Sequence, residues 1–162
     1  MWLNEYQVTL SKNESTPHLR NVNALYLDDM QRVTNPDDVV TVMKACRPCL
    51  TECADEYVYC LCLNVRGKPI GFFEVSHGGG GYAAFPVKEI FRKALLAGAM
   101  SIVLVHNHPS GDPTPSSLDV EATKKIVEAG RLLELEVHDH IVISKGTYAA
   151  IKDTNHELWE VS

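Results

Sequence analysis

No stretch of the sequence approaches the roughly 20 consecutive apolar residues that a membrane-spanning helix requires. The first residues, MWLNEYQVTLSKNEST, also lack the charged and then apolar pattern of a secretory signal peptide. These two absences argue against a membrane partner and against export, so we expect a soluble cytoplasmic protein.

Basic residues are fewer than acidic residues in this sequence. The sequence has 15 Lys and Arg residues against 21 Asp and Glu residues, which gives a formal net charge of −6 at pH 7. A protein that binds nucleic acid usually presents a broad basic face that neutralises phosphates, and this composition does not provide one. A local basic patch stays open, so DNA is a partner that the charge does not support.

Several motifs that would indicate other chemistry are missing. The sequence has no Gly-x-Ser-x-Gly elbow of a serine hydrolase, and no Walker loop or Gly-x-Gly-x-x-Gly loop that opens a helix. Zinc deaminases carry His-x-Glu followed by Pro-Cys-x-x-Cys, whereas the five cysteines here all precede the pair His106 and His108. The sequence therefore predicts neither an esterase, nor a nucleotide cofactor, nor a deaminase.

The five cysteines make a poor disulfide framework, because they are odd in number and crowded into residues 46–62. We expect reduced thiols. Three of them, Cys46, Cys49 and Cys53, have the spacing of one helix face. Cys60 and Cys62 alternate with apolar residues in a predicted strand. Core packing is therefore favoured over a second zinc site or a catalytic thiol.

The length of 162 residues, with 45% of them hydrophobic, suits one domain. Residues 1–35 are polar and weakly patterned, and we assign them to an N-terminal arm with one strand around 6–10; the domain spans 36–162. Hydrophobic periodicity and capping residues predict helices at 36–47, 86–98 and 116–134, and strands at 57–65, 69–76, 101–107 and 136–144. Elements interleaved in this way predict an α/β (α+β) domain of three layers with a mixed central sheet.

The segment LVHNHPSGDPTPSSLD, residues 104–119, holds the main candidate site. Residues two apart on a strand face the same way and lie about 6.6 Å apart. His106 and His108 can therefore converge on one metal ion if Asn107 ends the strand. Two histidines that decorate the mouth of a loop are the alternative.

Ser116 and Asp119 also allow two interpretations. The run Ser116-Ser117-Leu118-Asp119 resembles a capping box at the start of a helix, which needs no further role. A carboxylate in the first turn of a helix can also join two histidines around a metal ion and leave a fourth position open for water, as in catalytic zinc sites. Such a site needs a general base.

Glu74, in the apolar run GFFEV, is the candidate general base. Periodicity alone makes it a solvent-facing strand residue. The glycine run that follows, 77–81, suits either a flap that lets a substrate backbone approach or a plain mobile loop. His138 and His140 repeat the His-x-His spacing, and one of them is a candidate hydrogen-bond partner of a metal ligand.

Together these residues resemble the JAMM (MPN-plus) metalloprotease signature, which has a glutamate on a strand, then His-x-His-Pro, six residues, Ser, two residues and Asp. Every element is present, as Glu74, His106, His108, Pro109, Ser116 and Asp119. More narrowly, EVSHG, PVKEIFRKALLAGA, VHNHPSGDPTPSSLD and LEVHDHIVIS resemble the RadC-like branch of that superfamily over roughly residues 57–146.

The resemblance implies a deaminase-like three-layer α/β/α sandwich with a metal site. It implies Zn²⁺ held by His106, His108 and Asp119. It also implies a water activated by Glu74, and Ser116 helping to stabilise the oxyanion of a tetrahedral intermediate.

Three functions are consistent with these features. The first is a zinc-dependent hydrolase of amide bonds in a protein or peptide, peptide or isopeptide, in which Glu74 takes a proton from zinc-bound water and later protonates the leaving amine. The second is an accessory protein of DNA repair or of mobile elements, in which zinc is structural. The family often carries an N-terminal helix-hairpin-helix region that binds DNA, and residues 1–40 lack its Gly-rich hairpin, which weakens this hypothesis. The third is a noncatalytic binding module.

Overall fold

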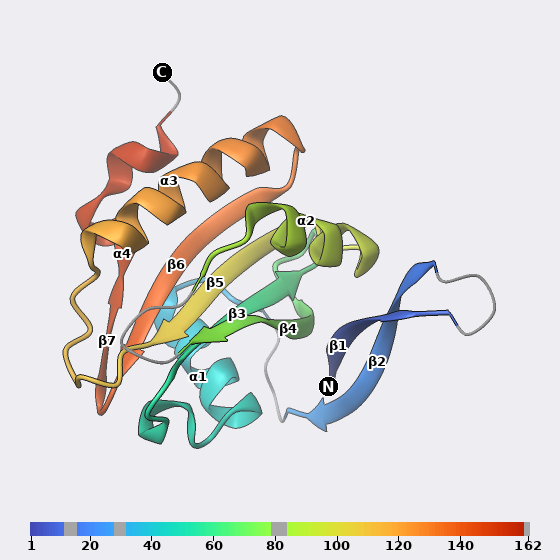
Figure 1. Ribbon diagram of the computed structural model, residues 1–162, viewed down its shortest axis with the longest axis horizontal. Coiled ribbons are helices and arrows are strands. Elements are labelled where there is room, and N and C mark those ends of the chain that lie inside the picture. The colour runs from blue at the N-terminus through green and yellow to red at the C-terminus, as the bar shows by residue number, and fades with distance from the viewer. Residues whose placement is uncertain (12–15, 28–31, 79–83, 161–162) are drawn as a thin grey trace.

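The computed structural model describes residues 1–11, 16–27, 32–78 and 84–160 (Figure 1). Its strands are β1 (Trp2–Leu10), β2 (Pro17–Tyr26), β3 (Glu56–Leu63), β4 (Pro69–Gly78), β5 (Ser101–Asn107), β6 (Glu136–Ser144) and β7 (Thr147–Ala150). Its α-helices are α1 (Pro36–Cys46), α2 (Val87–Leu96), α3 (Ser117–Leu132) and α4 (Ile151–Thr154), and two 3-10 helices, η1 and η2, lie at Leu50–Glu52 and His156–Trp159. Among the helices of these residues, none is long and apolar enough to cross a membrane.

The strands form one seven-stranded sheet in the order β2-β1-β4-β3-β5-β6-β7. The pairs β1 with β4 and β5 with β6 are parallel, and the other neighbouring strands are antiparallel. The predicted hairpin of β3 and β4 is present, and Gly67 in its turn has a φ of 70°, a backbone conformation that favours glycine. The mixed central sheet is confirmed.

Helix α1 covers one face of this sheet. The side chain of Asn35 caps the helix by accepting a hydrogen bond from the backbone N–H of Asp38. Pro36 occupies the first turn, where its missing N–H leaves no donor unpaired. The buried side of α1 packs on strand residues of the same face in one core cluster, which includes Val39, Val42, Met43, Leu61, Leu63, Val103 and Val105.

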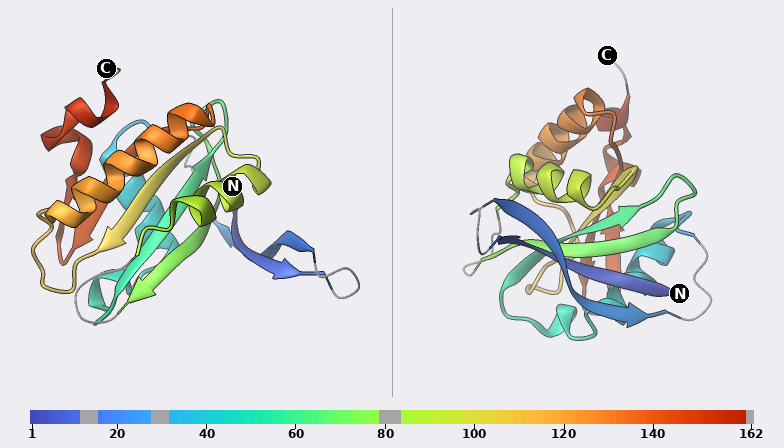
Figure 2. Two further views of the ribbon diagram at one scale, coloured as in Figure 1. Left: turned by 45° about the horizontal axis from the view of Figure 1, so that its top comes forward. Right: turned by 90° about the vertical axis from the view of Figure 1, so that its right-hand side faces the viewer.

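Helices α2 and α3 cover the opposite face (Figures 1 and 2). Successive strand residues point to opposite faces of a sheet, so the residues that alternate with those under α1 pack against these two helices. This second core cluster includes Cys60, Cys62, Phe73, Ile90, Phe91, Ala94, Ile102, Leu104, Ile126 and Val127. The predicted three-layer α/β/α sandwich is confirmed.

The five cysteines form no disulfide bond. Cys46, Cys60 and Cys62 are buried in the two core clusters, as predicted. The prediction of core packing is wrong for Cys49, which is exposed, and Cys53 is only partly buried. Their spacing matches one helix face with Cys46, but α1 ends at Cys46 and the other two flank η1. The helix cannot continue through Pro48, which has no backbone N–H to donate.

The N-terminal arm contains two strands rather than the one predicted. β1 and β2 form an antiparallel hairpin, which projects from the body of the protein in Figure 1. The arm joins the sheet where β1 pairs in parallel with β4, Asn4 with Gly71 and Glu5 with Phe72. The sequence did not show β2 because most of its side chains are exposed, and an exposed strand carries little hydrophobic periodicity.

Candidate metal centre

His106 and His108 lie at the carboxyl end of β5, and Asp119 lies in the first turn of α3. Every residue of β5 is buried between its neighbours β3 and β6. The backbone N–H of His108 donates to the carbonyl of Ile143 at 2.9 Å, which holds His108 beside β6. The proline-rich loop 109–115 then leads into α3, and the structure brings the three predicted ligands together.

The side chains of these three residues converge on one point. The Nε2 atoms of His106 and His108 are 3.0 Å apart. Asp119 Oδ1 lies 3.4 Å from His106 Nε2, and Asp119 Oδ2 lies 3.5 Å from His108 Nε2. Atoms bound to a tetrahedral zinc ion at about 2.0–2.1 Å lie about 3.3 Å from one another. The group therefore has the dimensions of a metal site.

A hydrogen bond from Nδ1 fixes the tautomer of His108, that is, which of its two ring nitrogens carries the hydrogen. Its Nδ1 lies 2.9 Å from the carbonyl oxygen of Asp112, which can only accept. Nδ1 therefore carries the hydrogen, and the lone pair of Nε2 faces His106 and Asp119. Two bare nitrogens and a carboxylate at these distances repel one another, and a cation between them relieves the repulsion. The residues therefore fit a divalent metal ion.

Ser116 and Asp119 satisfy both interpretations that their spacing allows. Ser116 Oγ accepts a hydrogen bond from the backbone N–H of Asp119, while Asp119 Oδ2 accepts from the backbone N–H and the hydroxyl of Ser116 at 2.7 and 2.6 Å. These contacts make a capping box, and they also orient the carboxylate toward the histidines. Burial alone raises the pKa of Asp119, but the neighbouring histidines and the hydrogen bond from Ser116 outweigh it and hold that pKa well below its usual range.

A cavity of about 750 Å³ opens beside the three ligands. His108, Ser116 and Asp119 line it together with Phe85, which precedes α2, and Glu56, the first residue of β3. A cavity of this size admits a segment of a larger substrate and brings it against the metal ligands.

Glu56 is the carboxylate that the structure adds to the predicted set. Val58 pairs directly with His106 across β3 and β5, so the two side chains share a face of the sheet. Glu56 lies two residues before Val58 and therefore points to that same face. Its exposed fraction is 9%. The sequence offered one signal for it, an acidic residue directly before a buried strand, but not the pairing that places it.

Glu74, the predicted general base, lies on the opposite face of the sheet. It pairs with Tyr59 across β3 and β4, and Tyr59 pairs with Val105, whose side chain lies in the core cluster under α1. The carboxylate of Glu74 contacts His77, with Oε1 2.7 Å from Nδ1. The structure does not bring Glu74 to the cavity that His108 and Asp119 line.

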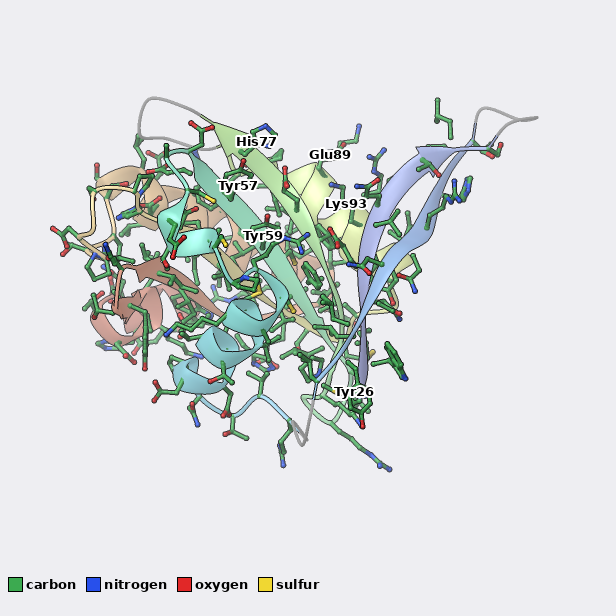
Figure 3. The ribbon with its side chains drawn as sticks, turned by 90° about the horizontal axis from the view of Figure 1, so that it is seen from below. Tyr26, Tyr57, Tyr59, His77, Glu89 and Lys93 are labelled. Atoms are coloured by element: carbon green, nitrogen blue, oxygen red, sulfur yellow. The ribbon has the colours of Figure 1, made fainter. Side chains whose placement is uncertain are left out.

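Figure 3 shows Tyr57, Tyr59 and His77 along the part of the sheet beside α1. The rings of Tyr57 and His77 are stacked with their centroids 5.2 Å apart. A hydrogen bond and the charge of Glu74 raise the pKa of His77. The predicted flap was assigned to residues 77–81, and its positions 79–81 lie outside the described residues.

Of the second histidine pair, His140 contacts a metal ligand, with its Nε2 2.8 Å from Nδ1 of His106. His138 instead makes an ion-pair contact with Glu136 at 3.1 Å. The difference follows from an irregularity in the pairing of β5 with β6. The register shifts between Ile102 and Val103 and skips His138, whereas His140 lies directly opposite Leu104, which shares its face with His106. The prediction of one hydrogen-bond partner in this pair is confirmed.

The family model of the RadC-like JAB domain matches residues 18–156, a range that contains the whole centre. The chain belongs to this family. Its RadC-like relatives include a UPF0758 protein of Methanosarcina barkeri, 36% identical over 83% of this chain and 57% of its own length. Another, from Caldanaerobacter subterraneus, is 40% identical over 79% of this chain and 54% of its own length. A third, from Listeria welshimeri, is 38% identical over 75% of this chain and 53% of its own.

The RadC-like chain thus spans little more than half the length of the curated relatives that it matches. The names of these relatives state no activity.

Proposed function

We propose that this protein is a metal-dependent hydrolase that cleaves an amide bond, peptide or isopeptide, in a polypeptide substrate. One observation carries the proposal: ligand atoms of His106, His108 and Asp119 converge on one point, and His108 and Asp119 line a cavity together with one further carboxylate, from Glu56. A metal site with three protein ligands and an adjacent carboxylate is the arrangement that activates water for hydrolysis.

His106, His108 and Asp119 would hold the metal ion, and Zn²⁺ suits their two imidazoles and one carboxylate. Bound there, zinc would supply a Lewis acid and lower the pKa of a water ligand to about 7. Three protein ligands leave room for that water. The burial of His106 and Asp119, at 1% and 6% exposure, keeps bulk solvent from competing for them.

Glu56 takes the role of general base in this proposal, in place of Glu74. A general base must reach the water whose proton it accepts, and Glu56 lines the cavity that contains His108. Glu56 also lies two residues before Val58, which pairs directly with His106, and this pairing supports a position close to the centre. Glu56 would then return the proton to the leaving amine.

Ser116 orients Asp119 in this proposal. Its hydroxyl hydrogen points to Asp119 Oδ2 at 2.6 Å, so it is not directed at the position of a substrate oxygen. Because Ser116 also lines the cavity, the oxyanion role that the family resemblance implies stays a prediction and is tested below.

The charge of the cavity favours a polypeptide over nucleic acid. Its lining includes four carboxylates and one lysine, namely Glu56, Asp112, Asp119, Glu121 and Lys125. Phosphate backbones are bound mainly through Lys and Arg. If the protein nevertheless acts on DNA, it should bind duplex or single-stranded DNA at low ionic strength with an affinity that falls steeply with salt.

We also propose the cytoplasm as its location. The support is the set of five cysteines that form no disulfide bond, since reduced thiols persist in a reducing compartment.

The decisive experiment compares Glu56→Gln with Glu74→Gln. Both substitutions remove one charge and keep the shape of the side chain. We expect both variants to retain metal, and Glu56→Gln to lose at least about 10²-fold in kcat on fluorogenic peptide or isopeptide substrates, with Glu74→Gln close to wild type. Full activity of Glu56→Gln would refute the assignment, and a wild type that binds no zinc would refute the hydrolase itself.

A further inference from the structure

His140 lies behind His106 and connects it to α3. It is fully buried in β6, and its Nε2 is 2.8 Å from Nδ1 of His106. Its Nδ1 is 2.7 Å from the hydroxyl oxygen of Thr123, which is also fully buried. That hydroxyl is in turn 2.6 Å from the backbone carbonyl oxygen of Asp119. The chain of hydrogen bonds thus begins at one proposed metal ligand and ends at another.

The direction of every hydrogen in this chain follows from its last member, the backbone carbonyl of Asp119. A backbone carbonyl can only accept, so the single hydroxyl hydrogen of Thr123 goes to Asp119. The Thr123 oxygen then accepts a hydrogen from His140 Nδ1. With its hydrogen on Nδ1, neutral His140 has a bare Nε2, which accepts from His106 Nδ1. His106 is left with the lone pair of Nε2 facing His108 and Asp119.

His140 is enclosed by its partners. Its side chain has no exposed surface, and both of its ring nitrogens are occupied, by Thr123 and by His106. The ring of Phe85 stands edge-on to both imidazoles, with centroids 5.6 Å from His106 and 5.1 Å from His140. An apolar ring at this place prevents water from replacing either hydrogen-bond partner.

We propose that Thr123 and His140 are positioning residues that fix the tautomer of His106 and so prepare its Nε2 to bind metal. The inference rests on the metal site of the proposed function, not on its substrate. Outer hydrogen bonds of this kind typically change metal affinity by about 10- to 100-fold. His108 needs no such device, because a backbone carbonyl orients it directly.

Thr123→Val is the test variant, and Thr123→Ser is its matched control. Valine keeps the branched shape but removes the hydroxyl, so His140 can move its hydrogen to Nε2 and donate it to His106, which then carries its own hydrogen on Nε2. Serine keeps the hydroxyl. In the metal-free proteins, long-range ¹H–¹⁵N spectra at about pH 8, above the ordinary histidine pKa of about 6.5, report the tautomer directly.

We expect His106 to be the Nδ1–H tautomer in the wild type and in Thr123→Ser, and to shift toward Nε2–H in Thr123→Val. Zinc affinity, measured by competition with a chromophoric chelator, should fall by about 10- to 100-fold in Thr123→Val and stay near wild type in Thr123→Ser. His140→Leu removes the nitrogen that accepts from His106, so it should weaken zinc binding by a similar factor. This variant replaces Thr123→Val in the test if the valine variant does not fold.

An unchanged tautomer and unchanged zinc affinity in folded Thr123→Val would overturn the inference. A wild type that binds zinc but hydrolyses no amide would defeat the proposed function and leave the inference standing. A wild type that binds no zinc would defeat the proposed function, while an Nδ1–H tautomer that depends on Thr123 would still support the hydrogen-bond direction.

Discussion

Glu74 lies directly opposite Tyr59 in the pairing of β4 with β3, and this pairing turns its carboxylate to the face of the sheet that α1 covers. The proposed metal ligands lie on the other face. A strand residue can reach only one face, so no change of side-chain rotamer would take Glu74 to the cavity. Glu56 occupies the required face because Val58, two residues later, pairs with His106.

Asp119→Asn should separate metal binding from helix capping. The amide oxygen can still accept from Ser116, so we expect a stability near that of the wild type, whereas loss of the negative charge should remove most bound zinc. Asp119→Ala should lose the metal and also about 0.5–2 kcal/mol of stability with the cap. Elemental analysis and urea unfolding of both variants test this. Retention of one zinc per chain in Asp119→Ala would remove Asp119 from the ligand set.

Ser116→Ala should destabilise the protein by about 1 kcal/mol, because it removes the helix N-cap. It should also weaken zinc binding, because Asp119 loses one of the hydrogen bonds that orient it. If Ser116 acts only through Asp119, saturating zinc should restore kcat. A kcat that stays about 10²- to 10³-fold low at saturating zinc would instead show an oxyanion-stabilising role.

Gly130→Ala should destabilise the protein by about 1–3 kcal/mol. A Cβ atom at this position in α3 would lie 2.6 Å from the carbonyl oxygen of Leu135 and 2.9 Å from Cγ2 of Val137, so helix and strand would have to move apart. Lys124→Ala, at an exposed position of the same helix, should change stability by less than about 0.5 kcal/mol. Thermal unfolding compares the two.

Gly71→Ala should loosen the N-terminal hairpin from the domain. A Cβ atom there would lie 2.1 Å from the ring of Tyr6, at the place where Gly71 pairs with Asn4. We expect a loss of about 1–3 kcal/mol in stability and faster hydrogen exchange in β1. Zinc affinity should not change, since neither residue contacts the metal centre, and a parallel loss of zinc would contradict this separation.

Asp139→Asn should change how stability depends on pH. Burial raises the pKa of Asp139 above its ordinary value of 3.8. Because the folded state holds this proton more tightly, the wild type loses stability as the pH rises from about 3.8 through the folded pKa. Asparagine does not titrate, and its oxygen can accept the same bonds from the backbone N–H groups of His140 and Lys152.

The gain in Tm of Asp139→Asn over the wild type should therefore grow with pH through this window and stay constant above it. A gain that shrinks as the pH rises would mean that the folded state favours the ionised carboxylate.

Much of this protein could be predicted because its signals are local. The capping of α1 by Asn35 depends on neighbouring residues, and so does the capping box of Ser116 and Asp119. The convergence of His106 and His108 could be predicted from one local feature, the end of a strand between the two residues. The hairpin of β1 and β2 was missed in part because most side chains of its outer strand, β2, are exposed. The helical spacing of Cys49 and Cys53 was misleading because Pro48 follows α1 so closely.

The sequence by itself determined the three-layer architecture, since hydrophobic periodicity and helix capping act over a few residues. It indicated His106, His108 and Asp119 as one ligand set through their match to the JAMM signature. Only the tertiary structure decided that Glu56 joins them and Glu74 does not, and that His140 rather than His138 supports His106. These placements depend on the register between strands that lie far apart in the chain. Strand pairing sets the face of the sheet on which a side chain lies, and no local pattern specifies that pairing.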